Sequence, residues 1–597
     1  MGSFREDCMV VHRPTEGLYR VRRWIHDDSI LLLEPILERG SGERGTRWAF
    51  EKDTVPIEKT MKTSSARETS CTRKRVASSK RVPRNGGVPS TATEPAAASS
   101  REHSVYRRAC KLDPRVLIRQ DEERAARGRG LFALKDVPKG TELMRVRAVA
   151  VAVESSAKKT SCCRCFRAAN PLCSLSLRPC SDCGFSFCAS CRKAESKEGH
   201  PHKENCLLNS VMEGLGSLQT DAGILRLAID LLVRRKKHGL VNDDEWEVMN
   251  TLQSQGCDGV GMGIPDDRFM QEARRKIERL AGFDVSNDDM ITMYYRLQRN
   301  LHQFNPSIDY VGQPSGLGMF PCAAMVNHAC RPNSCFHASV KSWTAAQPDV
   351  ELVLRNFHDV RAGEEICISY LNRIVDLNLQ ERRDSLQGSW GFTCHCRECE
   401  EEARVMEHGT AADKMCVMLR KKISAWLEKI MRQGTAALDH QQLKKLSTET
   451  IRSLDSGVEV SVCLKLQLAA SASSLVIRFA SPTGGRKTGF SAEEFHESVI
   501  ALLRLAIDAA SAGGYGGLNI IRLMRYRAKF ELEASRQAKG VDRDTLMWSA
   551  VNQAKAAVRL GVACLGEEHE HVAVLRKFEQ QMIVREMQAR LNSGQTS

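Results

Sequence analysis

Cysteine and histidine residues between positions 162 and 206 form closely spaced pairs that suit metal binding. Three pairs have the form CxxC and one has the form HxxxC: Cys162 and Cys165, Cys180 and Cys183, Cys188 and Cys191, and His202 and Cys206. Thiolates and imidazoles at such spacings bind Zn²⁺, four to each tetrahedral ion. The eight side chains therefore predict two structural zinc ions with no coordination position left open for chemistry.

Three further side chains in this region compete for ligand positions. His200 is an alternative to His202, but the spacing of His202 to Cys206 is the more usual one, so we favour His202. Cys163 and Cys173 are left over, and we expect them to be small buried residues rather than ligands.

A second cluster lies far along the chain in the segment CHCREC. It offers only the three thiolates of Cys394, Cys396 and Cys399, whereas tetrahedral zinc requires four ligands. Cys330, in the segment MVNHACRPNS at 325–334, is the candidate for the fourth; the alternative is a buried thiol with no ligand role. A shared ion would bring residues 325–334 beside residues 390–399.

Length, charge and cysteine content narrow the class of protein. A chain of 597 residues is long enough for roughly two to four domains. No segment has the run of about eighteen apolar residues that a membrane helix needs, and the first residues do not resemble a signal peptide, so we expect a soluble intracellular protein. In that setting 23 cysteines indicate metal sites rather than disulfides. The net charge of +15 favours acidic partners without specifying one.

Periodicity along the chain places these clusters between different kinds of element. We expect residues 1–110 to form a basic, mostly disordered tail, in which the basic runs at 73–75 and 80–84 are either a nuclear import signal or nucleic-acid contact, or a solvated linker. Short strands are predicted in 113–153 and 318–371, amphipathic helices in 209–305, and helices again from about residue 405 to the end.

Four segments resemble motifs of the SET- and MYND-domain family of protein lysine methyltransferases. RGRGLFALKDVPKGTEL is similar to the first SET motif, NHACRPN to the motif NHSCxPN, AGEEICISYL to the motif that ends in Ser-Tyr, and GFTCHCREC to the post-SET segment. They follow the family's order between about residues 112 and 400, and the first cysteine cluster stands where the family inserts its MYND finger. The helical remainder resembles the family's C-terminal domain more loosely.

The resemblance implies an α+β fold. Its parts are a β-rich SET core with a pseudoknot, an inserted zinc-binding MYND finger and helical insertion, a post-SET zinc site, and an α-helical, tetratricopeptide-like C-terminal domain. The implied divisions are 111–404 for the split SET domain with its post-SET segment at 390–404, 162–206 for the MYND finger, 207–305 for the helical insertion and 405–597 for the C-terminal domain.

The implied activity is S-adenosylmethionine-dependent methylation of lysine in histone or non-histone proteins. Tyr370 matches the family's catalytic tyrosine, whose hydroxyl would orient the lysine amine, and Trp390 stands with it in the substrate channel. Asn305 is an alternative to Asn300 as a cofactor contact. The cofactor contacts that the resemblance implies are Gly128, Arg129, Gly130, Asn300, Asn327, His328, Tyr370 and Phe392.

The family also implies how the ligands share three zinc ions. The MYND pairs would cross, so that Cys162, Cys165, Cys188 and Cys191 hold one ion and Cys180, Cys183, His202 and Cys206 hold another. The third ion would be held by Cys330, Cys394, Cys396 and Cys399.

Three positions depart from the family pattern. Ala329 replaces a serine, Cys188 and Cys191 are one residue closer together than usual, and Trp390 replaces an aromatic residue that is often tyrosine. The last change keeps an aromatic wall but removes a hydroxyl, so we expect the activity or the degree of methylation to differ.

Two other functions remain open on the sequence alone. A weak or inactive SET core with a MYND finger would act as a scaffold that binds proline-rich peptides in transcriptional or cytoplasmic complexes. A nucleic-acid contact through the basic tail would be weak and electrostatic. We expect a monomer without a membrane contact, in the nucleus or cytoplasm, with a protein substrate.

Overall fold

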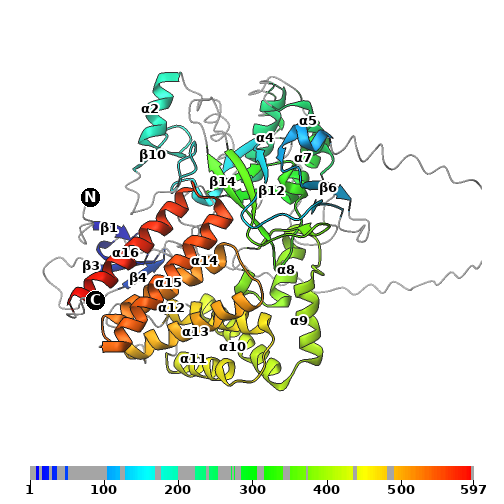
Figure 1. Ribbon diagram of the computed structural model, residues 1–597. Coiled ribbons are helices and arrows are strands. Elements are labelled where there is room, and N and C mark those ends of the chain that lie inside the picture. Colours follow the sequence, from blue (N-terminus) through cyan, green and yellow to red (C-terminus); the bar gives the residue numbers. More distant parts are fainter. Residues whose placement is uncertain are drawn as a thin grey trace, which may run out of the picture. The chain divides into compact units, whose positions relative to one another are not determined.

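The structure is a computed structural model of the chain, shown in Figure 1. The chain divides into two compact units, Met1–Arg101 and Glu102–Ser597, and each is described by itself. Apart from a few isolated positions, the structure describes residues 9–12, 17–25, 30–35, 47–50, 104–120, 128–167, 176–198, 222–236, 241–252, 286–304, 315–340, 350–371, 374–433, 440–479, 490–538 and 540–592.

The N-terminal unit contains a four-stranded antiparallel sheet in the order β1-β2-β3-β4. Its strands are β1 Met9–His12, β2 Gly17–Ile25, β3 Ile30–Pro35 and β4 Arg47–Phe50. The tail was expected to be mostly disordered with a short element in DDSILLLEPILE, which contains β3, whereas β1, β2 and β4 were not expected. Their sequences are rich in Val, Ile, Leu and aromatic residues, which favour strands, whereas the Ser-, Pro- and Lys-rich composition belongs to later residues. The basic runs at 73–75 and 80–84 lie outside the described residues.

Three small antiparallel sheets form the core of the second unit, in the orders β16-β7-β6, β14-β15-β8-β5 and β12-β13-β9. The predicted strand regions at 113–153 and 318–371 contain most of them. The strands are β5 Lys111–Leu112, β6 Val116–Gln120, β7 Arg129–Ala133, β8 Glu142–Arg147, β9 Ala150–Val153, β12 Leu301–Phe304, β13 Gly316–Met319, β14 Ser334–Val340, β15 Val350–Asn356 and β16 Glu365–Ile366.

The core of this unit begins before the expected boundary at residue 111. Val105 and Tyr106 are buried in the same apolar cluster as the strands, at 5% and 3% exposure. The hydroxyl of Tyr106 accepts a hydrogen bond from the Arg129 guanidinium at 2.9 Å. Residues from about 104 are therefore part of the folded unit rather than of the tail.

The segments around residues 328 and 368 lie side by side although forty positions separate them. His328 and Ile368 form a parallel bridge outside the named strands. The Ile368 N–H donates to the Asn327 carbonyl at 3.0 Å, and the Ala329 N–H donates to the Ile368 carbonyl at 2.9 Å. This crossing joins the two segments in which the chemistry-bearing side chains were expected.

The insertions between the strands are cysteine-rich and then helical. The first contains β10 Leu177–Pro179, β11 Ser186–Cys188 and α2 Ala189–Glu198. The second contains α4 Ala222–Lys236, α5 Asp243–Asn250 and α7 Asn287–Asn300. Apolar side chains of α4, such as Leu225 and Leu231, are fully buried against the sheets.

The rest of the second unit is helical, as the periodicity predicted. The helices are α8 Leu379–Trp390, α9 Arg397–His408, α10 Ala411–Gln433, α11 His440–Asp455, α12 Val462–Phe479, α13 Ala492–Ala512, α14 Leu518–Ser535, α15 Gly540–Leu565 and α16 Glu570–Asn592. From α12 onward each helix packs on the next (Figure 1). Their largest apolar cluster also contains Cys330, which comes from the β-rich part of the chain.

We searched the helices of the described residues for a membrane span. None of them combines the length and the apolar character that crossing a bilayer requires.

Candidate functional site

The start of β7 forms an open backbone surface beside the 327–328 segment. Gly128 has φ +74°, a conformation that favours glycine. At Gly130 an added Cβ would lie 2.8 Å from Glu365 Oε1 and 2.9 Å from Asn327 Nδ2. Only glycine therefore fits at Gly130 without displacing the side chains that line this surface.

Asn327 ties together the strands that meet at this surface. Its side-chain amide donates to the Arg129 carbonyl at 3.0 Å and to Glu365 Oε1 at 2.8 Å. Because a primary amide has two donor hydrogens, these two bonds use its donor capacity and leave its oxygen to the site. The amide thus holds β7 and β16 at a fixed separation around the glycines.

His328 has hydrogen-bond partners inside the protein for both ring nitrogens. Its Nδ1 accepts from the Tyr370 N–H at 3.0 Å, and its Nε2 lies 3.3 Å from Cys330 Sγ. A backbone N–H can only donate, so Nδ1 carries no proton and the neutral ring is protonated at Nε2. The buried imidazole, 4% exposed, thus connects a cysteine of the second cluster to the backbone of Tyr370.

Tyr370 stands in an aromatic wall. Its hydroxyl donates to the Val326 carbonyl at 2.9 Å. Its ring centroid lies 5.3 Å from those of His328 and Trp390, and 6.4 Å from that of Phe392. Burial, with smaller contributions from Cys367 and Glu365, raises the pKa of Tyr370, so the phenol stays protonated at neutral pH. It is a hydrogen-bonding group and not a base.

The end of α8 places the two other aromatic rings. The helix ends at Trp390, and Gly391 follows with φ +75°, the left-handed conformation of many helix ends. This turn brings Phe392 back to 6.3 Å from the His328 ring. Arg299 at the end of α7 donates to the Trp390 carbonyl at 2.7 Å. The neighbouring Asn300 donates its side-chain amide to the Arg296 carbonyl at 2.7 Å.

The first cysteine cluster converges as the sequence suggested. Four buried sulfur atoms lie within 4.8 Å of one another, those of Cys162, Cys165, Cys188 and Cys191. A hydrogen bond from Cys165, the largest of several influences, helps to lower the pKa of Cys162 to about 7. Four buried thiols at this spacing suit a divalent metal ion. The shortened spacing between Cys188 and Cys191 does not prevent this convergence.

The proposed second site is only partly described. Cys180 and Cys183 flank the turn before β11, where the Gly184 N–H donates to the Cys180 carbonyl at 3.0 Å. His202, Cys206, His200 and Cys173 lie outside the described residues, as does Asn305. Cys163 lies within them, partly buried and outside the four-sulfur group.

The second cluster joins Cys330 to the three cysteines of the post-SET segment. The sulfur atoms of Cys330, Cys394, Cys396 and Cys399 lie within 4.8 Å of one another and are all buried. Cys330 Sγ is 3.5 Å from Cys399 Sγ and 4.0 Å from Cys394 Sγ. Four sulfurs about 2.3 Å from one tetrahedral ion would be about 3.8 Å apart. The cluster therefore has the dimensions of a closed four-thiolate metal site.

Comparison with known proteins agrees with this arrangement. The SET domain family profile matches residues 128–371, which include the glycines of β7, the crossing at His328 and Tyr370. Residues 128–371 are therefore similar to a SET domain. Human histone-lysine N-methyltransferase SMYD1 is 24% identical to it over 339 residues, 53% of this chain and 64% of SMYD1. Human N-lysine methyltransferase SMYD2 is 25% identical over 304 residues, 49% of this chain and 61% of SMYD2.

A plant protein matches a shorter stretch at higher identity. Histone-lysine N-methyltransferase ASHR2 of Arabidopsis thaliana is 35% identical over 85 residues, 14% of this chain and 20% of ASHR2. The chain spans less than two thirds of the length of each of these three relatives.

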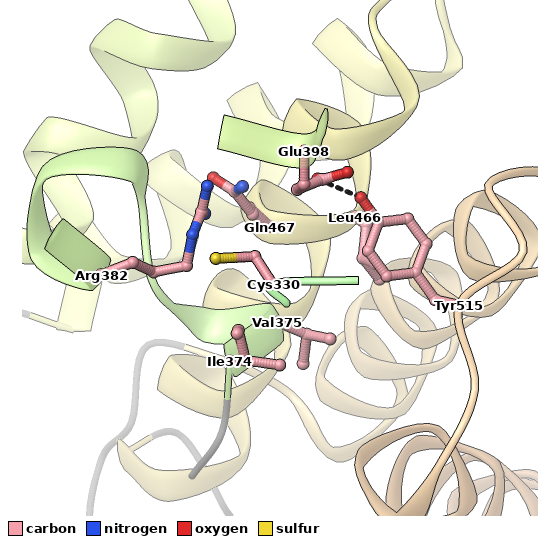
Figure 2. A pocket seen from close by; sticks show the side chains of 8 residues that line it. All are labelled: Cys330, Ile374, Val375, Arg382, Glu398, Leu466, Gln467 and Tyr515. Atoms are coloured by element: carbon pink, nitrogen blue, oxygen red, sulfur yellow. Dashed lines mark hydrogen bonds between the residues drawn. The ribbon is translucent and has the colours of Figure 1, made fainter. Parts of the chain in front are cut away.

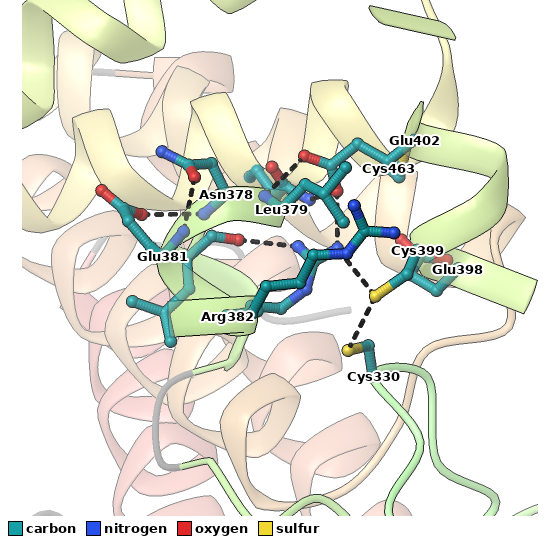
Figure 3. Close-up of polar contacts among 12 residues, drawn as sticks. Cys330, Asn378, Leu379, Glu381, Arg382, Glu398, Cys399, Glu402 and Cys463 are labelled. Carbon is teal, nitrogen blue, oxygen red and sulfur yellow. Dashed lines mark hydrogen bonds and ion pairs between the residues drawn. The ribbon is translucent and has the colours of Figure 1, made fainter. Parts of the chain in front are cut away.

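A network of buried polar side chains lies next to Cys330 and Cys399 (Figure 3). The sequence analysis did not predict this network. Arg382 of α8, only 1% exposed, donates to Glu402 Oε2 at 2.7 Å. A group of Glu398, Glu402 and Cys463 lies within metal-binding range. Both Glu402 oxygens already accept hydrogen bonds, from Arg382 and from the Leu379 N–H, so we interpret this group as structural.

Proposed function

We propose that this SET-domain protein transfers a methyl group from S-adenosylmethionine to a lysine of a protein substrate. The observation that carries the proposal is the position of the Tyr370 hydroxyl, in an aromatic wall and bonded to the carbonyl of Val326, the residue before the Asn327 that contacts β7. The names of the relatives, histone-lysine and N-lysine methyltransferases, support the same reaction.

The residues of the β7 surface fit the methyl donor. A Cβ at Gly130 would displace Asn327 and Glu365, which we assign to the wall of the donor site, and Gly128 and Arg129 continue the same backbone edge. When bound, S-adenosylmethionine supplies a methyl group on a positively charged sulfonium. Because the His328 ring nitrogens are engaged inside the protein, we assign the His328 contact to its backbone. Phe392 packs near the adenine, and Asn300 is the remaining polar contact.

Tyr370 and Trp390 act on the incoming lysine. Only the neutral amine has a lone pair with which to attack, so the channel must disfavour the ammonium form. The aromatic rings of Tyr370 and Trp390 exclude water, which lowers the pKa of a buried amine. The protonated Tyr370 hydroxyl then orients that amine, and alignment accounts for most of the rate gain. Trp390 supplies no hydroxyl, so methylation degree depends on Tyr370 and the width of the channel.

Metal binding belongs to the same proposal. Zinc fits both four-sulfur groups, because closed tetrahedral thiolate sites are the usual structural zinc sites. We propose a third ion at Cys180, Cys183, His202 and Cys206. The three ions would stabilise the fold and take no part in methyl transfer. A histone substrate would place the protein in the nucleus, and a non-histone substrate would allow the cytoplasm.

Calorimetry on the zinc-replete full chain tests the proposal. We expect S-adenosylmethionine to bind with a dissociation constant of about 1–100 μM. The Asn327→Ala variant should lose this binding, whereas Tyr370→Phe should keep it and lose methyl transfer to protein lysines. A folded wild-type chain that does not bind the donor would contradict the proposal and favour a scaffold function.

A further inference from the structure

Arg382 lies between the post-SET cysteines and the C-terminal helices (Figure 3). Its Nη2 is 3.8 Å from Cys399 Sγ and 2.7 Å from Glu402 Oε2, and its Nη1 donates to the Leu377 carbonyl at 2.9 Å. Both members of the ion pair have side chains only 2% exposed. The guanidinium thus contacts a proposed metal ligand and a carboxylate at the same time.

Glu402 extends this contact to α12. Its Oε2 also accepts a hydrogen bond from the Gln467 side-chain amide at 2.8 Å, and its Oε1 accepts from the Leu379 N–H at 2.9 Å. Gln467 belongs to α12 and is 4% exposed. A continuous chain of hydrogen bonds therefore runs from Cys399 through Arg382 and Glu402 to Gln467.

A second set of contacts runs from the same cluster to the start of α14. Tyr515 donates its hydroxyl to Glu398, the residue before Cys399. Arg331, the residue after Cys330, donates to the Gly513 carbonyl at 3.1 Å and stands 5.6 Å from the centre of the Tyr515 ring. Figure 2 shows Cys330, Arg382, Glu398, Gln467 and Tyr515 around one small pocket.

The charge of the cluster gives Arg382 a specific part in this arrangement. Four thiolates around a divalent ion carry net negative charge, and in a buried site such charge must be offset. The guanidinium near Cys399 offsets it, and a hydrogen bond to a ligand also fixes the ligand's orientation. When the ion leaves, nothing holds the four sulfurs at their present spacing, so Cys399 can move away from Arg382.

We propose that metal binding at the post-SET cysteines controls how firmly α12 is held, and that Arg382 is the positioning residue that conveys it. The proposal rests on the metal site of the proposed function but not on methyl transfer. The same α8 helix ends at Trp390, so a shift of Arg382 would also move a wall of the lysine channel. Loss of the ion would thus loosen α12 and widen the channel together.

Two paired variants separate this role from general stability. Arg382→Met/Glu402→Gln removes the buried charges together, and the amide oxygen of the introduced glutamine can still accept from the Leu379 N–H. Removing both charges avoids an unpaired buried ion. The control Arg397→Met/Glu401→Gln removes an ion pair on the surface of α9, the helix that carries Glu402; in it Arg397 Nε lies 2.8 Å from Glu401 Oε1. Glu401 Oε2 also lies 3.5 Å from Arg331 Nη2, and the amide oxygen of the introduced glutamine can still accept from Arg331.

The experiment measures amide hydrogen exchange and metal affinity on the full chain. On chelation of the wild type and the control, exchange around Gln467 should accelerate at least about tenfold, whereas exchange around Val558 and Leu575, which pack against Phe357, should change little. The Arg382→Met/Glu402→Gln chain should show fast exchange around Gln467 with and without metal. In competition with a chromophoric chelator it should bind Zn²⁺ about 10- to 100-fold more weakly.

Three results would overturn the proposal. One is unchanged exchange around Gln467 when the wild-type cluster loses its ion. Another is that the Arg382→Met/Glu402→Gln chain shows the same change in exchange around Gln467 on chelation as the wild type. The third is an absence of metal from the cluster in the purified protein. Each can occur in a chain that still binds S-adenosylmethionine, so failure here is distinguishable from failure of the methyltransferase proposal.

Discussion

His328 shows which part of a motif the sequence can predict at the scale of single residues. The motif NHACRPN indicated that Asn327 and Cys330 belong to one site, since their residue types suit a polar contact and a metal ligand. It did not predict that the imidazole turns inward to Cys330 and to the Tyr370 N–H. That partner lies 42 positions away, and only the crossing at Ile368 brings it near.

Gly130→Ala tests the close approach at β7. The new Cβ would meet Glu365 Oε1 at 2.8 Å and Asn327 Nδ2 at 2.9 Å, closer than such atoms approach in proteins. We expect at least about tenfold weaker binding of S-adenosylmethionine in calorimetry, equivalent to about 1.4 kcal/mol. The control is Gly388→Ala in α8, where nothing lies within 4 Å of the added Cβ. Equal donor binding by both variants would show that the β7 surface does not hold the donor.

Tyr370→Phe tests the hydroxyl that we assign to the lysine amine. The change removes a single hydrogen bond, to the Val326 carbonyl, so the loss of stability should be about 1 kcal/mol. If the hydroxyl orients the amine in the transition state, kcat should fall about 100-fold or more, with KM for the protein substrate nearly unchanged. Single-turnover kinetics with a labelled methyl donor checks this. A kcat within a few-fold of wild type would remove Tyr370 from the catalytic role.

At the scale of elements, the local pattern of apolar residues predicted the regular strands and helices. It missed short strands that lie beside long polar segments. The segments SCFHASV and VELVLRNF were predicted as strands. They form β14 and β15, which pair with each other in one antiparallel sheet. The strands β1, β2 and β4 were missed because the polar residues that follow them dominate the composition of 1–110, whereas β3 lies in DDSILLLEPILE, where a short element was expected. The buried role of Arg382 was equally unpredictable, since a charged side chain in an amphipathic helix is usually exposed.

His337 of β14, which lies near His569 in the turn before α16, should make the stability of the folded chain sensitive to acid. Burial, with His569, Arg355 and Arg145 nearby, lowers the pKa of His337 to about 3. An unfolded chain binds this proton at a pKa of about 6.5. Below that pH the unfolded state binds more protons than the folded state, so stability is lost as pH falls toward the folded pKa.

Urea unfolding at two pH values measures this loss. Between about pH 7 and pH 5, the wild type should lose about 2 kcal/mol more than His337→Gln, whose side chain does not titrate. The variant should be less stable at neutral pH but less sensitive to acid. His408→Gln, at a histidine whose side chain is 81% exposed, should keep the wild-type dependence. If His337→Gln shows the same loss as wild type, His337 is not the acid-sensitive group.

At the scale of the second unit, two buried clusters among the described residues are prominent in joining the β-rich core to the C-terminal helices. One is the post-SET cysteine cluster, whose four sulfurs belong to the apolar core of the helices. The other is Phe357, which follows β15 and is fully buried against Ile521, Val558 and other residues of α14 to α16. Neither contact could be predicted from local periodicity, because a contact between segments far apart in the chain produces no periodic pattern in either segment. The motifs predicted the cluster only because metal ligands must converge.

Measuring the metal content of variants tests whether the metal sites and the binding of S-adenosylmethionine depend on one another. We expect about three zinc ions per chain by elemental analysis, one for each set of four ligands. Cys330→Ser should remove about one ion and also weaken binding of S-adenosylmethionine, because Cys330 holds the turn that carries Asn327 and contacts the His328 ring. Cys335→Ser is the matched control, since Cys335 lies on the adjoining strand outside the four-sulfur group.

A corresponding pair of variants tests the first cysteine cluster. Cys162→Ser should remove one ion and Cys163→Ser none, because only the first of these neighbouring cysteines belongs to the four-sulfur group. If the finger is a separate structural part, Cys162→Ser should leave the affinity for S-adenosylmethionine within about threefold of wild type, unlike Cys330→Ser. Loss of donor binding in both variants would mean that the two metal sites stabilise one cooperative unit. Loss in neither would remove the proposed link between the post-SET ion and the donor, because the turn at Asn327 would then keep its shape without the metal.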